Sequence, residues 1–195
     1  MLPRRLAAPV SLAAKLAMVD EPHVAPLNAL VRRIRLQHAG VPFFDPEAGG
    51  VNARILFLLE APGPKAVDFV SLDNNDQTAE NMLRLLVESG INRGDTCNWN
   101  VVPFYIGNAD RTKLRAAKQT DLDAGKPWVT ALLDLLPRLD TVVLMGRHAQ
   151  KARRLIEALR PTVRIVEAWH PSPLCLNRVK ARRDELLSTL REVAR

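Results

Sequence analysis

The sequence predicts an α/β fold, a three-layer αβα sandwich around a central four-stranded, largely parallel sheet. Four short apolar runs alternate along the chain with amphipathic stretches. The segments between these runs are long enough for the right-handed crossover helices that join parallel strands. The first run, Arg54 to Leu59 (RILFLL), is continuously apolar, as strands buried on both faces of a parallel sheet are.

The length and composition indicate one ordinary globular unit. With 195 residues and 47% apolar content, the chain can bury a single substantial core. We expect one domain over 1–195, with a helical N-terminal extension (1–50) and an α/β core (51–195). No run reaches the ~20 apolar residues of a membrane span, and Lys15 interrupts the mildly apolar N-terminus, so neither a membrane partner nor a signal peptide is expected. The two cysteines fit reduced thiols and a cytoplasmic location.

The first half of the chain supplies two helices and two strands. Apolar residues recur at helical spacing within 25–39, which predicts a helix. A connection rich in proline and glycine leads to the strand at 54–59. A helical pattern over 80–89 follows a polar loop, and a short apolar strand at 98–102 ends before a proline.

The second half repeats the alternation of helix and strand. Its first stretch, 108–126, is polar and is expected to be irregular. Continuous apolar runs then predict strands, and glycine or proline separates them from amphipathic helices. The expected elements are helix 128–136, strand 141–145, helix 149–159, strand 163–168 and helix 179–193.

Positive charge is concentrated near the C-terminus. Residues 147–195 hold 12 Lys/Arg against 5 Asp/Glu, whereas residues 1–146 hold 16 of each. This asymmetry suggests that a polyanion approaches one face of the molecule. The alternative is that the helices simply carry solvated cations, as surface helices commonly do.

Two proline-stiffened turns are the candidate site. The first turn, Glu60-Ala61-Pro62-Gly63, and the second turn, His170-Pro171-Ser172-Pro173, each follow a predicted strand, and Asn100 lies within a third. In parallel sheets, ligands bind beyond the carboxyl ends of the strands, where all three would meet. Alone, each has a simpler interpretation: a Pro-Gly turn, a structural histidine and a satisfied buried amide.

In combination, these residues resemble the uracil-DNA glycosylase superfamily, and the resemblance covers roughly residues 51 to 185. The first turn is similar to the Gly-Glu-Ala-Pro-Gly motif of the family 4 enzymes. The second turn with Leu174 is similar to the His-Pro-Ser-Pro-Leu motif of family 1. Asn100 stands where the superfamily has its uracil-reading asparagine.

The match departs from both families at three points. Leu59 replaces the glycine that opens the family 4 motif, and the four cysteines that bind its iron–sulfur cluster are absent. Ala61 falls where family 1 has the aspartate that positions water, and an alanine cannot do so. Which residue orients water is therefore open.

The resemblance implies roles that agree with the chemistry of glycosidic cleavage, which produces an anionic base and a cationic sugar. His170 would donate a hydrogen bond to uracil O2, and a neutral imidazole suffices. Asn100 would pair with N3–H and O4. Glu60 would be the carboxylate near the sugar, with Asp68, Asp73 and Asp76 as rivals.

The resemblance also implies which residues would surround the base and the DNA. Ala61, Pro62 and Gly63 would border the base, and Phe69 would stack on it, unless Phe69 simply packs in the core. Gly63 stands where family 1 has the tyrosine that excludes thymine. Leu174 would fill the space of the flipped nucleotide. The phosphate backbone of the DNA would be held by Lys65, Thr78, Ser172, Arg178, Lys180 and Arg182.

We therefore expect a monomeric, monofunctional enzyme that excises uracil from DNA without a metal or cofactor. No lysine lies within the two turns to form a Schiff base, so strand cleavage is not expected. Two alternatives remain: a protein of the same fold that binds uracil-containing or single-stranded DNA and hydrolyses it poorly, and a small-molecule hydrolase or nucleotide-binding protein.

Overall fold

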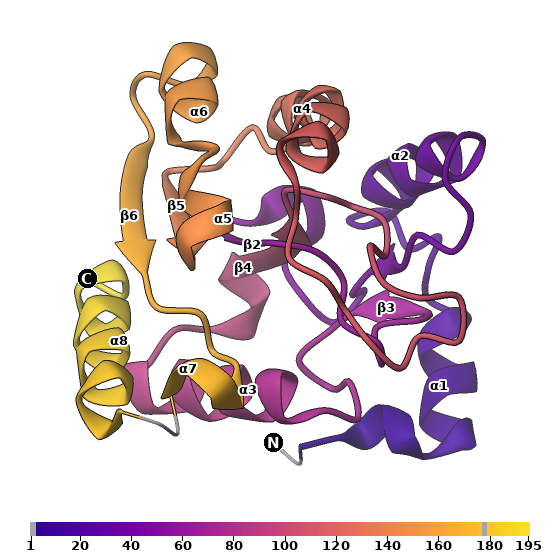
Figure 1. Cartoon of the computed structure of the whole chain (residues 1–195), viewed down its shortest axis with the longest axis horizontal. Coiled ribbons are helices and arrows are strands. Elements are labelled where there is room, and N and C mark those ends of the chain that lie inside the picture. The colour runs from indigo at the N-terminus through magenta and orange to yellow at the C-terminus, as the bar shows by residue number, and fades with distance from the viewer. Residues whose placement is uncertain (1–2, 177–178) are drawn as a thin grey trace.

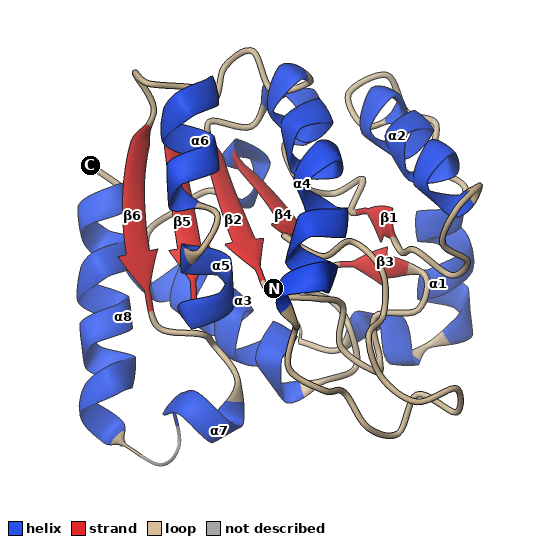
Figure 2. Cartoon of the chain, turned by 45° about the horizontal axis from the view of Figure 1, so that its top comes forward, coloured by secondary structure: helices blue, strands red, loops and turns tan. Residues whose placement is uncertain are grey.

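The computed structural model describes residues 3–176 and 179–195 and confirms the α/β fold (Figure 1). Its central sheet has four strands in the order β4-β2-β5-β6, and every neighbouring pair is parallel. The strands are β2 (Ile55–Leu59), β4 (Thr96–Asn100), β5 (Thr141–Met145) and β6 (Arg164–Ala168). Their carboxyl ends therefore all lie at one edge, as the arrowheads in Figure 2 show.

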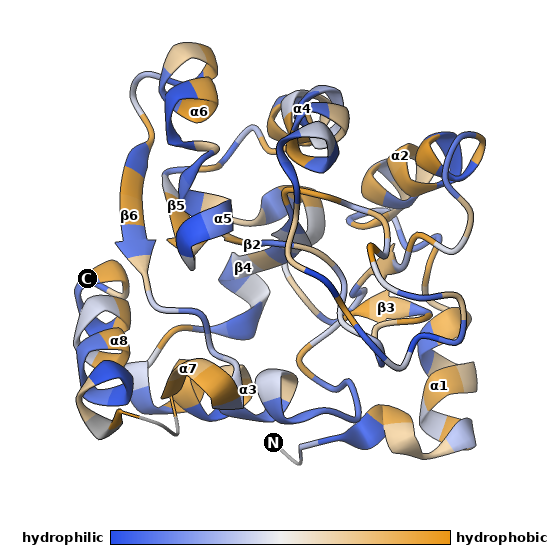
Figure 3. Ribbon diagram, viewed as in Figure 1, coloured by the Kyte–Doolittle hydropathy of each residue, from blue (hydrophilic) through white to orange (hydrophobic). Residues whose placement is uncertain are grey.

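Helices cover both faces of this sheet. Three of its strands, β2, β4 and β5, are buried along almost their whole length. Alternate residues of β2 enter different cores: Leu56 and Leu58 join one, and Ile55 and Phe57 the other. The first core is closed by helices α2 (Ala25–Arg35), α4 (Gln119–Asp134) and α6 (Arg153–Leu159), and the second by α3 (Gln77–Ser89) and α8 (Lys180–Val193). In Figure 3, hydrophobic and hydrophilic segments alternate along α2, α6 and α8, as in helices with one buried face. The layers are those of the expected sandwich.

The segment expected to be irregular over 108–126 is partly helical, because α4 begins at Gln119. Leu122 and Val129 lie on one side of this helix and are buried. Gly125 allows this helix to approach the backbone of Val101 closely, because a Cβ at position 125 would lie 2.0 Å from the Val101 carbonyl oxygen. Packing against the segment that follows β4 thus stabilises a helix whose sequence, with Gly125 and Pro127, disfavours one.

The remaining differences concern short elements. The helix expected over 149–159 is two helices, α5 (Arg147–Gln150) and α6, and α4 extends the helix expected over 128–136 at its start. Two two-residue strands, β1 (Phe43–Phe44) and β3 (Phe69–Val70), pair with each other outside the main sheet. Helices α1 (Pro9–Leu16) and α7 (Pro173–Leu176) were also not expected as separate elements. Such short segments carry too little periodicity to be recognised.

A buried ionic cluster joins the N-terminal extension to the core. Lys15 Nζ, on α1, lies 2.9 Å from Asp45 and 2.5 Å from Asp73. Arg93, before β4, pairs with the same two carboxylates. The carboxylates of Asp45, Glu47 and Asp73 lie close enough together to hold a cation. The positive charges of Lys15 and Arg93 pair with these carboxylates.

No helix in the described part of the chain is both long and apolar enough to cross a membrane.

Candidate active site

The candidate residues come from the carboxyl ends of three of the four central strands, β2, β4 and β6. Leu59, the last residue of β2, is in register with Asn100, the last residue of β4. Glu60 follows directly, and the backbone N–H of Val102 donates to its carbonyl oxygen at 2.9 Å. The parallel sheet thus brings the first turn, Asn100 and the second turn to one edge, as expected (Figure 2).

Asn100 presents an uncommitted amide there. Its side chain is 3% exposed, and its Nδ2 is buried with no hydrogen-bond partner in the described part of the chain. A buried donor left unpaired costs about 1–3 kcal/mol. Such a cost in a strand that is otherwise fully buried is typical of a group that awaits a ligand.

His170 is held in one tautomer by its own turn. The backbone N–H of Ser172 donates to His170 Nδ1 at 3.1 Å, so the proton of the neutral ring lies on Nε2. Burial lowers the pKa of His170 below its ordinary value of 6.5, although the nearby Glu60 carboxylate raises it in part. At neutral pH the ring is therefore uncharged and offers one donor, Nε2–H.

Two neighbours fix the second turn in place. Asn81 Nδ2, on α3, donates to the Pro171 carbonyl oxygen at 2.8 Å. On the other side, Gly146 has φ +89° and ψ 160°, a conformation open only to glycine. A Cβ at Gly146 would lie 3.1 Å from the Cβ of His170, so the turn that contains Gly146 packs closely against the second turn.

Glu60 is held by two partners that the sequence did not suggest. Its Oε1 accepts the backbone N–H of Ala117 at 2.6 Å, and its Oε2 lies 2.9 Å from Nδ1 of His148. In the sequence, His148 follows only a single turn glycine, Gly146, and belongs to no recognisable motif. Its position directly after the third predicted strand, at the edge that carries the other candidates, was the available signal.

The loop before α4 also clasps the first turn. The Arg111 guanidinium donates to the carbonyl oxygens of Gly63 and Pro64, each at 3.2 Å, and of Ala66 at 3.1 Å. It also lies 4.2 Å from the ring centroid of Tyr105. Of the turn itself, Pro62 is buried, and a Cβ at Gly63 would meet no atom within 4 Å.

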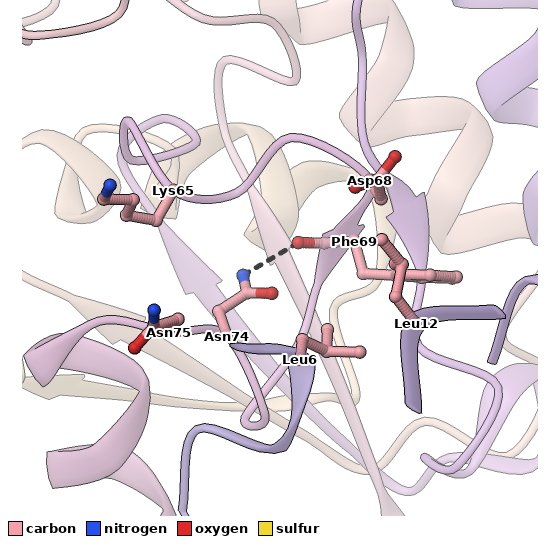
Figure 4. Close-up of a pocket in the computed structure, with 7 residues that line it drawn as sticks. All are labelled: Leu6, Leu12, Lys65, Asp68, Phe69, Asn74 and Asn75. Atoms are coloured by element: carbon pink, nitrogen blue, oxygen red, sulfur yellow. Dashed lines mark hydrogen bonds between the residues drawn. The ribbon is translucent and has the colours of Figure 1, made fainter. Parts of the chain in front are cut away.

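The rival carboxylates have other contacts. Asp73 is fully buried in the ionic cluster, where the Lys15 and Arg93 cations lower its pKa. Asp76 caps α3, and its side chain accepts the Ala79 N–H at 2.9 Å. Asp68 lines a separate pocket instead (Figure 4). Glu60 is the carboxylate of the four that extends one of the central strands.

Phe69 lies in β3 and has no exposed surface. Its ring lies 6.3 Å from that of Phe43 and 5.9 Å from Lys15 Nζ. It forms part of the pocket in Figure 4, whose walls come from the N-terminal segment and from the loop after the first turn: Leu6, Leu12, Lys65, Asp68, Phe69, Asn74 and Asn75. Stacking of Phe69 on a base stays a prediction.

The predicted DNA contacts are distributed around this edge. Leu174, in α7, is 71% exposed, and Lys65 is exposed in the loop after the first turn. Thr78 and Ser172 are half-buried at the start of α3 and in the second turn. Arg182 lies over the Trp169 ring, 4.5 Å from its centroid. Lys180 begins α8, and Arg178 lies outside the described residues.

Comparisons with known proteins identify a family and a similar fold. Residues 46–194 match the family model described as the uracil DNA glycosylase superfamily. The solved crystal structure of wild-type SMUG2 from Pedobacter heparinus is similar, with a TM-score of 0.51 and 14% identity over 86% of this chain and 81% of that chain. No curated protein matches the sequence. Because the family model spans most of the chain and the fold agrees, the chain belongs to the uracil DNA glycosylase superfamily.

Proposed function

We propose that this protein is a monofunctional DNA glycosylase that hydrolyses the N-glycosidic bond of uracil flipped out of DNA and leaves an abasic site. One observation carries the proposal. At one edge of the sheet, Asn100 and His170 each offer a donor without a partner in the described part of the chain: Nδ2 of the amide and Nε2–H of the imidazole. Uracil has acceptors, O4 and O2, for both.

Asn100 would identify the base. Its Oδ1 accepts the uracil N3–H while its Nδ2 donates to O4. Cytosine reverses both features, because its N3 is an acceptor and its 4-amino group a donor. A site that must leave buried polar groups unpaired with the wrong base rejects that base strongly. The open space beside Gly63 offers no barrier to the thymine methyl group, so exclusion of thymine would depend on other residues.

His170 would stabilise the leaving group. As the C1′–N1 bond breaks, its electron pair moves into the uracil ring and negative charge develops on O2. A neutral imidazole donating from Nε2 is preorganised for that charge, and its lowered pKa keeps the ring neutral before the reaction. The oxygen of a water molecule then bonds to C1′, and the proton that this water loses balances the charge of the departing base.

Glu60 would act on the sugar side of the bond. A carboxylate there offsets the positive charge of the oxocarbenium-like sugar and can accept a hydrogen bond from the attacking water. Ala61 cannot take this role, and the carboxylates of Asp73 and Asp76 are engaged elsewhere. Glu60 therefore remains the best candidate.

The exposed Leu174 would fill the space that the flipped nucleotide vacates. The phosphate backbone of the DNA would be held, without readout of its sequence, by Lys65, Thr78, Ser172, Arg178, Lys180 and Arg182. Two free cysteines, one of them buried, agree with the expected cytoplasmic location. We also propose that the protein acts as a monomer.

The test is cleavage of labelled oligonucleotides that carry a single uracil, followed by alkali, which breaks the strand at an abasic site. Matched strands with thymine, cytosine and hypoxanthine serve as controls. A cut at uracil supports the proposal. Salt-sensitive binding of the uracil strand without a cut would favour a DNA-binding protein of the same fold. Absence of both would favour a small-molecule hydrolase.

A further inference from the structure

The carboxylate of Glu60 is held from two sides by distant parts of the chain. On one side the Ala117 N–H donates to Oε1 at 2.6 Å, and on the other His148 Nδ1 contacts Oε2 at 2.9 Å. Glu60 and His148 are both partly buried, with side chains 23% and 29% exposed. A terminal carboxylate torsion is normally broad. Contacts to both oxygens restrict it.

His148 reaches Glu60 because of the turn after β5. β5 pairs with β2, the strand that precedes Glu60, and Leu144 is in register with Leu58. The Gly146 N–H donates to the Ala168 carbonyl oxygen at 2.9 Å, which ties the turn to β6. The chain then enters α5, and its second residue, His148, lies against the first turn.

The chemistry of the contact fixes the tautomer of His148. An ionised carboxylate only accepts hydrogen bonds, so Nδ1 of His148 must donate to Glu60. The neutral ring therefore carries its proton on Nδ1, the opposite of His170, whose Nδ1 accepts from Ser172. The two histidines of this edge thus have different tasks: one donates outward from Nε2, and the other donates from Nδ1 to a protein carboxylate.

We propose that His148 is a positioning residue, which orients the Glu60 carboxylate for the water that attacks C1′. This inference rests on the proposed function. A carboxylate has about four lone-pair sites. Ala117 and His148 each take one, so a lone pair on each oxygen remains for water and for the developing charge of the sugar. A reacting group displaced by about 1 Å can cost about 100-fold in rate.

Three substitutions at one position test the role of the Nδ1 donor. Asparagine places an amide donor near the position of Nδ1, glutamine places it nearer Nε2, and alanine removes it. We expect His148→Ala and His148→Gln to slow single-turnover excision of uracil about 10- to 100-fold at saturating enzyme, with unchanged DNA affinity. His148→Asn should restore most of the rate. His38→Ala removes an imidazole that stacks on Phe104 elsewhere and should leave the rate unchanged.

A double-mutant cycle checks that His148 acts through Glu60. Once Glu60→Gln has removed the carboxylate, adding His148→Ala should cause little further loss, because residues that act as one unit are not additive. Full additivity would overturn the inference, as would an unchanged rate in His148→Ala while the wild type is active.

A nuclear magnetic resonance measurement on the full chain gives a readout that needs no activity. The ¹⁵N signals of His148 should show a protonated Nδ1 in the wild type, and this preference should be lost in Glu60→Ala. A wild type that excises no base would overturn the proposed function alone. In that case, an Nε2–H tautomer of His148 would overturn the contact with Glu60, and with it this inference.

Discussion

At the residue scale, the candidate site presents hydrogen-bond donors to a ligand. Within the described residues, the buried Nδ2 of Asn100 has no hydrogen-bond partner, and His170 keeps Nδ1 engaged so that Nε2 can donate. An unpaired buried donor costs folding free energy and benefits only a bound ligand. Substitution at the two positions should therefore separate activity from stability.

Replacing Asn100 by alanine tests this separation. Asn100→Ala removes the donor and the acceptor that would read uracil, and we expect excision to fall about 100-fold or more, which corresponds to about 2.7 kcal/mol. The melting temperature should not fall, because the substitution deletes an unpaired buried group. Calorimetry and single-turnover kinetics measure the two effects. A melting temperature several degrees lower would mean that Asn100 has a structural role.

The lowered pKa of His170 predicts a pH dependence of stability. Below about pH 6.5, its ordinary pKa, the unfolded chain binds a proton at this ring that the folded chain resists. Stability contributed by the neutral ring is therefore complete above pH 6.5 and decreases as the pH falls toward the lower folded value. Urea unfolding between pH 7.5 and 5 should show a smaller decrease for His170→Asn than for the wild type. Parallel pH profiles would contradict the assignment.

At the element scale, α7 carries the residue proposed to meet the DNA stack. This helix begins at Pro173, the last residue of the second turn, and its Leu174 is 71% exposed. Because Leu174 is mostly exposed, it contributes little to the core, and its apolar surface is available to contact a ligand.

Truncating Leu174 should distinguish duplex from single-stranded substrates. Leu174→Ala removes the group that would fill the vacated stack, so we expect excision from duplex DNA to fall about 10-fold and excision from single strands to change little. Leu36→Ala, at an 86% exposed leucine beyond α2, is the matched control. Equal losses on both substrates would exclude the wedge role.

Elements with a strong local signal were predictable from the sequence, and those stabilised only by packing were not. The apolar runs of β2 and β5 and the helical periodicity of α2 were sufficient to predict these three elements. The positions of the two turns after predicted parallel strands, and of Asn100 within another, predicted that Glu60, Asn100 and His170 lie at one edge of the sheet. The first half of α4 was missed because its stability comes from packing of Gly125 against Val101, in the segment after β4. The contact of His148 with Glu60 joins residues 88 positions apart, which no local pattern reveals.

At the scale of the whole molecule, the N-terminal extension is bound through charge as well as apolar packing. Lys15 is 3% exposed and contacts two buried carboxylates from other parts of the chain. A buried charge left without its partner is strongly destabilising, so the cluster links α1 to the loops that precede α3 and β4.

Lys15→Met measures this link. Loss of the cation leaves Asp45 with Arg93, and Asp73 with Arg93 and the partly exposed Arg5. We expect the free energy of unfolding to fall by about 3–5 kcal/mol in one cooperative transition. Arg32→Met breaks an exposed ion pair with Asp20 and should cost at most about 1 kcal/mol. Two separate transitions in the wild type would show instead that the extension unfolds independently, against the expectation of one domain.

The strand order has a consequence for synthesis of the protein. Of the four central strands, β2 emerges first from the ribosome but lies between β4 and β5, and β6, which precedes His170, is the last strand made. Parallel neighbours cannot pair until the crossover between them exists. Glu60 and Asn100 can therefore be set side by side while the chain is still growing, but His170, the proposed donor to O2, arrives only with the last strand. A nascent or C-terminally truncated chain would hold the residue proposed to read the base without the histidine proposed to stabilise its release.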